Sequence, residues 1–89
     1  MNIYITNLPP SISREALQEL LNSYGPVDTI YIGQDKHSGM GNGTAYVRMQ
    51  TEEAAEQLLL NLDGADYKGN KLRIVKADEA DFPTNDFWN

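Results

Sequence analysis

Residues 42–49, Asn-Gly-Thr-Ala-Tyr-Val-Arg-Met, alternate with a period of two between small or apolar residues and polar or aromatic ones. This alternation is typical of a strand that buries one face and exposes the other. The inward residues are Gly43, Ala45, Val47 and Met49, and the outward residues are Asn42, Thr44, Tyr46 and Arg48. The stretch therefore predicts a strand, from Gly43 onward, whose exposed face carries an aromatic ring and a cation.

Three further strands are expected from similar patterns, over residues 2–8, 27–32 and 71–77. In the first strand, Ile3 and Ile5 face inward, whereas Tyr4 and Thr6 face outward. The outward positions of the other two strands include Tyr31, Lys71 and Arg73. We therefore expect the exposed face of the sheet to combine tyrosines with cationic side chains.

Two helices are predicted between these strands. Ser13 and Thr51 are good N-caps, and apolar residues follow each of them at helical spacing. The apolar stripes are Leu17, Leu20, Leu21 and Tyr24 in the first helix, and Ala54, Ala55, Leu58, Leu59 and Leu62 in the second. Gly25-Pro26 is expected to end the first helix after Tyr24, and Asp63-Gly64 to end the second.

The order β-α-β-β-α-β predicts one α+β domain of ferredoxin-like architecture over residues 1–77. Two right-handed crossovers side by side give a four-stranded antiparallel sheet with both helices on one face. The other face stays open. Residues 34–42 are expected to form a polar loop, and residues 78–89 a flexible, acidic tail that contains aromatic residues.

Two of the predicted strands resemble the signatures of the RNA-recognition-motif family. Residues 3–8, Ile-Tyr-Ile-Thr-Asn-Leu, are similar to the shorter signature, and residues 42–49 to the longer one, written K/R-G-F/Y-G/A-F-V-x-F/Y. Positions 43 and 45–47 agree with the longer signature, whereas Asn42, Thr44 and Met49 depart from it. The resemblance covers residues 2–77 and extends to small, stand-alone bacterial members of the family.

The resemblance implies a module that binds single-stranded RNA on the open sheet face. In the family, the positions of Tyr4 and Tyr46 each stack one base. Thr44 lacks the aromatic ring that the family places against the sugars, so we expect weaker binding, which Tyr31 could partly offset. The full set of expected RNA-binding residues is Tyr4, Thr6, Tyr31, Asn42, Thr44, Tyr46, Arg48, Lys71 and Arg73. Single-stranded DNA remains an alternative ligand.

The formal net charge of −6 runs against the usual basic character of nucleic-acid-binding domains. The outward sheet positions nevertheless hold cations and, on this reading, no carboxylate. The acids concentrate on the predicted helices and in residues 78–89. We therefore expect a basic open face on an acidic domain, with reduced long-range attraction for RNA.

Other function classes fit the sequence less well. A protein-interaction domain of the same fold, with little RNA affinity, is the alternative that the low pI favours. No catalytic constellation, metal site or cofactor site is expected, because the chain has no cysteine and one histidine, His37, in a polar loop. With no signal-peptide pattern and no membrane-spanning apolar run, a cytoplasmic protein is expected. The resemblance to small, stand-alone members of the family implies a monomer.

Three roles are open for residues 78–89. The segment could be an inert, solubilising end, or a linear motif that recruits a protein partner. Alternatively, Phe82, Phe87 or Trp88 could fold back over Tyr4 and Tyr46 and so imitate a bound RNA strand.

Overall fold

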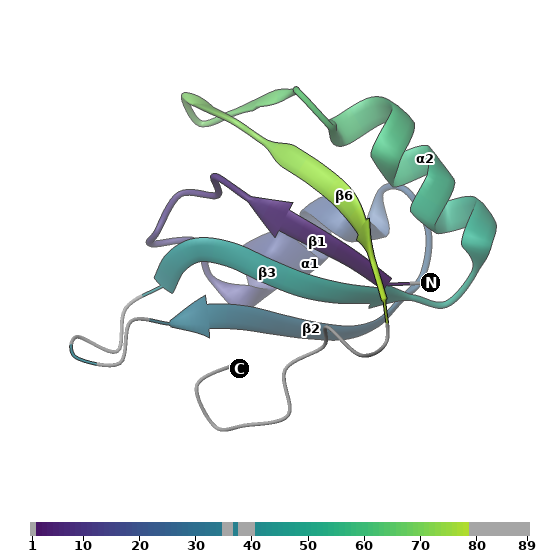
Figure 1. Ribbon diagram of the computed structural model, residues 1–89, viewed down its shortest axis with the longest axis horizontal. Helices are drawn as coiled ribbons and strands as arrows, with labels where there is room; N and C mark the ends of the chain where they lie inside the picture. The colour runs from purple at the N-terminus through teal and green to yellow at the C-terminus, as the bar shows by residue number, and fades with distance from the viewer. Residues whose placement is uncertain (1, 35–36, 38–40, 79–89) are drawn as a thin grey trace.

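A computed structural model describes residues 2–34, 37 and 41–78 of the chain. The elements follow one another as β1 (Asn2–Thr6), α1 (Arg14–Asn22), β2 (Val27–Gln34), β3 (Gly41–Met49), α2 (Glu52–Leu62), β4 (Asp66–Tyr67), β5 (Asn70–Lys71) and β6 (Arg73–Ala77) (Figure 1). The expected β-α-β-β-α-β order is confirmed, with one short hairpin added before the last strand.

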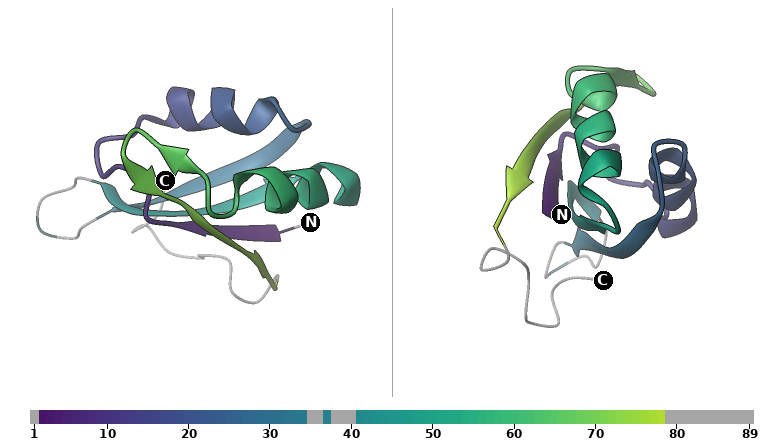
Figure 2. Two further views of the ribbon diagram at one scale, coloured as in Figure 1. Left: turned by 90° about the horizontal axis from the view of Figure 1, so that it is seen from above. Right: turned by 90° about the vertical axis from the view of Figure 1, so that its right-hand side faces the viewer.

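The main sheet has four antiparallel strands in the order β2-β3-β1-β6. Both helices lie on one side of this sheet, and no described helix or strand covers its other side (Figure 2). The two central strands are β3 and β1, which carry the two family-like signatures. The predicted ferredoxin-like architecture is thus confirmed.

The helices begin at the residues that the capping pattern predicts. The Ser13 Oγ accepts a hydrogen bond from the Ala16 N–H at 3.1 Å, and the Thr51 Oγ1 accepts one from the Ala54 N–H at 3.1 Å. Each cap satisfies an N–H that has no partner within the helix. The caps therefore fix where each crossover ends and its helix begins.

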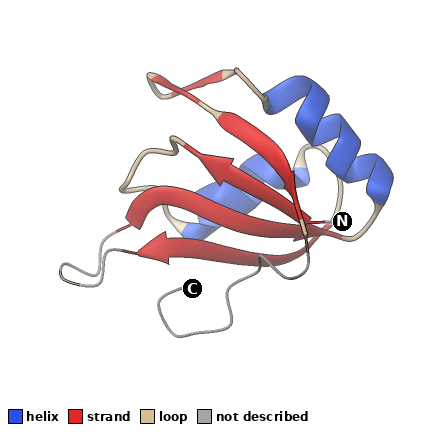
Figure 3. Cartoon of the chain, viewed as in Figure 1, coloured by secondary structure: helices blue, strands red, loops and turns tan. Residues whose placement is uncertain are grey.

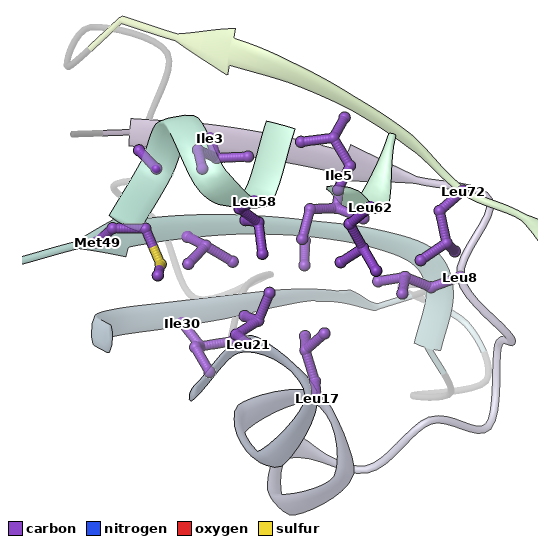
Figure 4. Close-up of a cluster of buried hydrophobic side chains, with 14 of the residues drawn as sticks. Ile3, Ile5, Leu8, Leu17, Leu21, Ile30, Met49, Leu58, Leu62 and Leu72 are labelled. Carbon is purple, nitrogen blue, oxygen red and sulfur yellow. The ribbon is translucent and has the colours of Figure 1, made fainter. Parts of the chain in front are cut away.

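The core lies between the helices and the inward side of the main sheet (Figure 4). Leu17 and Leu21 of α1 and Leu58 of α2 are fully buried against the sheet. The strands contribute their alternate residues to the same core: Ile3, Ile5, Ile30, Ile32, Ala45, Val47, Met49 and Ile74. The inward positions that the period-two pattern assigned to these residues are therefore correct.

The predicted strand over residues 71–77 is wrong in one respect, because it is divided at Leu72. Its first residue, Lys71, belongs to β5, which pairs with β4 in a separate two-stranded sheet, whereas Leu72 lies between the strands. Only Arg73–Ala77 join the main sheet (Figure 3). Lys68 and Gly69 connect β4 to β5 with φ values of 50° and 88°. Two successive positive φ values are those of a type I′ hairpin turn. Because of this turn, Lys71 pairs with β4 and not with the main sheet.

Three other predicted boundaries differ from the observed ones. β1 ends at Thr6 because Asn7 has a φ of 66°, which does not continue a strand. α1 ends with Ser23 as its C-cap, earlier than the predicted end at Tyr24. The hairpin between β2 and β3 is longer than expected, since β2 extends to Gln34 and β3 begins at Gly41.

Close packing of two backbone segments requires glycine at the start of β3. The Leu8 N–H donates to the Gly43 carbonyl at 2.9 Å. Gly43 has a φ of 82°, and a Cβ there would lie 2.8 Å from the carbonyl oxygen of Leu8. A Cβ at Gly41 would collide with the carbonyl oxygen of Pro10. These glycines therefore allow β3 to pack closely against the segment that follows β1.

Replacing Gly43 by alanine should therefore destabilise the fold by at least about 2 kcal/mol, because the positive φ and the collision with Leu8 both oppose it. Gly64 is a matched control, since it has the same φ of 82° but nothing within 4 Å of a Cβ. Gly64→Ala should cost only about 1 kcal/mol. Urea denaturation followed by circular dichroism measures both, and equal losses would contradict the packing role.

Candidate nucleic-acid interface

A row of three tyrosines and a valine crosses the open face of the main sheet. The Cα partners place Tyr31 of β2 beside Tyr46 of β3, Tyr46 beside Tyr4 of β1, and Tyr4 beside Val75 of β6. We call these four residues the aromatic row. Since side chains alternate along a strand and Ile3, Ile5, Ala45 and Val47 are buried in the core, the row points away from the helices.

The two central tyrosines contact one another. The ring centroids of Tyr4 and Tyr46 lie 4.5 Å apart, with an angle of 37° between the ring planes. Both side chains are half-buried, as is Tyr31. The ring faces that they present are flat, apolar and wide enough to receive a nucleobase.

A second row lies beside the aromatic row and carries the first cation. Its members, in strand order, are Thr29, Arg48, Asn2 and Ala77. The Arg48 Nε donates to the Asn2 Oδ1 at 3.3 Å, and Asn2 is only 8% exposed. This contact helps to orient the Arg48 guanidinium next to the tyrosines.

Arg73 lies on the other side of the aromatic row. It is exposed, and its Cα partner is Thr6 of β1. Arg73 precedes Val75 by two residues on β6, whereas Arg48 follows Tyr46 by two residues on β3. Because the pairings Tyr4–Val75 and Tyr4–Tyr46 are both antiparallel, the two arginines flank the aromatic row on opposite sides.

Asn42 and Thr44 lie at the start of β3 and are joined by their side chains. The Asn42 Oδ1 accepts hydrogen bonds from the Thr44 N–H at 3.1 Å and from the Thr44 hydroxyl at 2.6 Å. The hydroxyl proton of Thr44 is therefore donated to Asn42 within the strand. This end of the face therefore offers small polar groups in place of an aromatic ring.

Lys71 does not lie on the main sheet, contrary to its predicted position. It belongs to β5, where its Cα partner is Asp66, and its carbonyl oxygen accepts a hydrogen bond from the Asn7 Nδ2 at 2.8 Å. Its exposed side chain is therefore placed by the β4–β5 hairpin, beyond the end of β1.

The helices carry most of the acids among the described residues, together with the cation Arg14. The exposed acids of the helices are Glu15, Glu19, Glu52, Glu53 and Glu56. Lys76 belongs to the helix side as well, because its Cα partner Ile3 faces the core and it lines a groove with Glu56. The two rows contain Arg48 and no acid.

One exposed acid was not anticipated on the sheet. Asp28 lies in β2 at a register shift between Val27 and Thr29, where β2 has one residue more than β3. Such an irregularity interrupts strict alternation, so the period-two pattern could not assign Asp28 to a face. The expectation that the outward sheet positions hold no carboxylate therefore stays a prediction at Asp28.

Asn2, Thr29 and Val75 belong to the two rows but were not among the predicted site residues. All three are outward by simple alternation from Tyr4, Tyr31 and Arg73. The sequence pattern therefore contained the signal, although it did not show which outward residues become neighbours across the sheet.

The described part of the chain lacks two features that would indicate another kind of protein. Residues 2–34, 37 and 41–78 contain no group of three or more His, Cys, Asp and Glu side chains that could hold a metal ion. None of the helices in these ranges is both long and apolar enough to cross a membrane.

Comparison with known proteins relates this geometry to a family. The model of the family described as the RNA recognition motif matches residues 3–73. In the cyanobacterium Nostoc sp., a relative named "Putative RNA-binding protein RbpE" is 31% identical over 77 residues, which are 86% of this chain and 78% of that protein.

Two solved structures are similar both in fold and in sequence. The crystal structure of RNA-binding protein PG1 superposes with a TM-score of 0.83 at 33% identity, over 89% of this chain and 95% of that one. A chain from the Sxl-lethal protein/RNA complex gives a TM-score of 0.82 at 31% identity, over 85% of this chain and 47% of that one. The fold, the signatures on β1 and β3 and these matches agree: the chain belongs to the RNA recognition motif family.

Proposed function

We propose that this chain is a non-catalytic module that binds single-stranded RNA on the open face of its main sheet. The observation that carries the proposal is the register of the sheet, which aligns Tyr4, Tyr46 and Tyr31 in one row beside Arg48. Membership in the RNA recognition motif family, the names of its relatives and the RNA complex among its structural neighbours support the proposal.

Stacking supplies most of the proposed affinity. Each base that stacks on an aromatic side chain contributes about 1–3 kcal/mol. Neighbouring strands lie about 4.8 Å apart, so rings on β1, β3 and β2 can support successive unpaired bases. Tyr4 and Tyr46 stack one base each in this proposal, and Tyr31 adds a third platform.

Polar and charged side chains around the rings position the strand. Arg48 and Arg73 contact phosphates or base edges from opposite sides of the aromatic row. Thr6, Asn42 and Thr44 offer hydrogen bonds to sugars or bases near Arg73 and the start of β3. Lys71 contributes a more distant phosphate contact from the β4–β5 hairpin.

These contacts suit about two to four nucleotides held with micromolar or weaker affinity, where 1 μM corresponds to about −8.2 kcal/mol. Thr44 sets this limit, because it provides no ring to press on the sugars. The domain acts as a monomer in the cytoplasm in this proposal. Single-stranded DNA, which lacks the 2′-hydroxyl but retains bases and phosphates, is a weaker ligand for the same face.

Replacing both Tyr4 and Tyr46 by alanine should reduce RNA affinity by at least about thirtyfold, because two stacks of at least about 1 kcal/mol each are lost. Fluorescence anisotropy with a labelled pool of short, randomised single-stranded RNA measures the change. Tyr67→Ala is the matched control, since Tyr67 lies in β4 and lines a groove with α1. Circular dichroism shows whether each variant folds. Undiminished affinity in the folded double variant would refute stacking on these rings.

Arg73→Gln should lower the salt dependence of RNA binding. One phosphate contact on a single strand contributes about −0.7 to the slope of log K against log salt, so the slope should become shallower by about that amount. Lys76→Gln removes the same charge from the helix side of β6 and should leave the slope unchanged. Equal changes in the two variants would show that overall charge, and not contact at the face, sets the slope.

A further inference from the structure

The outward surface of the main sheet carries aromatic, apolar and cationic side chains that can contact an acidic, aromatic peptide as well as a nucleic acid. Val75, at 45% exposure, extends the aromatic row with an apolar side chain beside Tyr4. Arg48 and Arg73 flank the row on opposite sides. Rings of Phe or Trp bind such a strip by the same stacking and apolar contacts as bases do, while carboxylates take the place of phosphates.

The chain itself contains a segment of this composition. Residues 79–89 read Glu-Ala-Asp-Phe-Pro-Thr-Asn-Asp-Phe-Trp-Asn. They hold three acids and three aromatic residues, and no lysine or arginine. Their charge is thus opposite to that of Arg48 and Arg73.

The segment is attached at the edge of the face that it complements. β6 is an edge strand, and its last residue, Ala77, has Asn2 as its Cα partner in the row that contains Arg48. Four strands spaced by about 4.8 Å span about 15 Å. Eleven residues reach up to about 36 Å when extended, which is ample to cross the face. A short tether also keeps the segment at roughly millimolar effective concentration, so individually weak contacts suffice.

We propose that residues 79–89 dock on the open face of the same molecule, with their aromatic side chains on the aromatic row and their acids toward Arg48 and Arg73. The inference rests on the proposed function in one respect, namely that RNA and the segment compete for the face. The apparent association constant for RNA then equals the intrinsic constant multiplied by the fraction of molecules whose face is open. Release of the segment should accordingly raise RNA affinity by about threefold to tenfold.

The docking can be measured without RNA, because Trp88 is the only tryptophan of the chain. Acrylamide should quench Trp88 fluorescence less in the full-length protein than in a synthetic peptide of residues 79–89. Arg48→Glu should restore quenching to the level of the peptide. Lys76→Glu, the same charge reversal on the helix side of β6, should not. Quenching of the wild-type protein equal to that of the peptide would overturn docking.

Competition with RNA is tested by neutralising acids in two places. One variant carries Glu79→Gln, Asp81→Asn and Asp86→Asn, and the other Glu19→Gln, Glu53→Gln and Glu56→Gln on the helices. Each replaces three acids, so the formal net charge changes equally from its value of −6. The first should bind randomised single-stranded RNA about threefold to tenfold more tightly than wild type, and the second clearly less so. Equal gains in RNA affinity would show that net charge alone causes the effect, and would overturn competition between RNA and the segment.

The two assays separate this inference from the proposed function. Protection of Trp88 that depends on Arg48, in a protein with no affinity for RNA, would support docking and refute RNA binding. RNA binding by a protein whose Trp88 is fully accessible would refute docking and leave the proposed function intact. Protection that grows with protein concentration would assign the segment to the face of a second copy and overturn docking within one molecule.

Discussion

The pairing of β1 with β3 determines what the open face presents. In the observed register, Ile3 lies opposite Val47 and Ile5 opposite Ala45, all four of them fully buried, while Tyr4 lies opposite Tyr46. A slip of one residue would turn the tyrosines of one strand toward the core. Burying an isoleucine or valine contributes about 1.5–3 kcal/mol, which exceeds the ~0.5–1.5 kcal/mol of an aromatic pair. The core therefore sets the register, and the exposed tyrosines follow from it.

The division of charge between the two sides of the sheet reconciles an acidic protein with an RNA-binding face. The helix acids lie on the order of 10 Å behind the sheet, beyond a Debye length of about 8 Å at physiological salt. They are therefore largely screened from a ligand that is already on the face. At low salt the screening weakens, and the net charge of −6 should then slow the approach of RNA. An acidic domain of this kind should bind RNA through direct contacts at the face, with little non-specific electrostatic attraction.

The sequence predicted the layout of the face because two independent patterns agreed. Period-two alternation assigned Tyr4, Tyr46 and Arg48 outward, and the family signatures placed the same residues on the two central strands. The structure adds what neither pattern contains, which is the alignment of Tyr31 and Val75 with the central tyrosines across four strands. Cross-strand register depends on turns and bulges, which a single strand does not reveal.

The errors have local backbone causes. The turn at Lys68-Gly69 was missed because lysine seldom occupies a position of positive φ, and it moved Lys71 off the main sheet. The register shift in β2 left Asp28 outside the alternating pattern. Neither change alters the aromatic row, because the row is fixed by the core beneath it. The predicted role of each site residue in binding RNA stays a prediction.

An amide NMR titration of the full-length protein with short, randomised single-stranded RNA at low salt tests the central claim most directly. The account predicts chemical-shift changes concentrated in β1, β3 and β6 and in residues 29–31 of β2, with little change in α1 and α2. Changes that centre on the helices, or no change at near-millimolar RNA in either the full-length chain or a chain ending at Asp78, would contradict it.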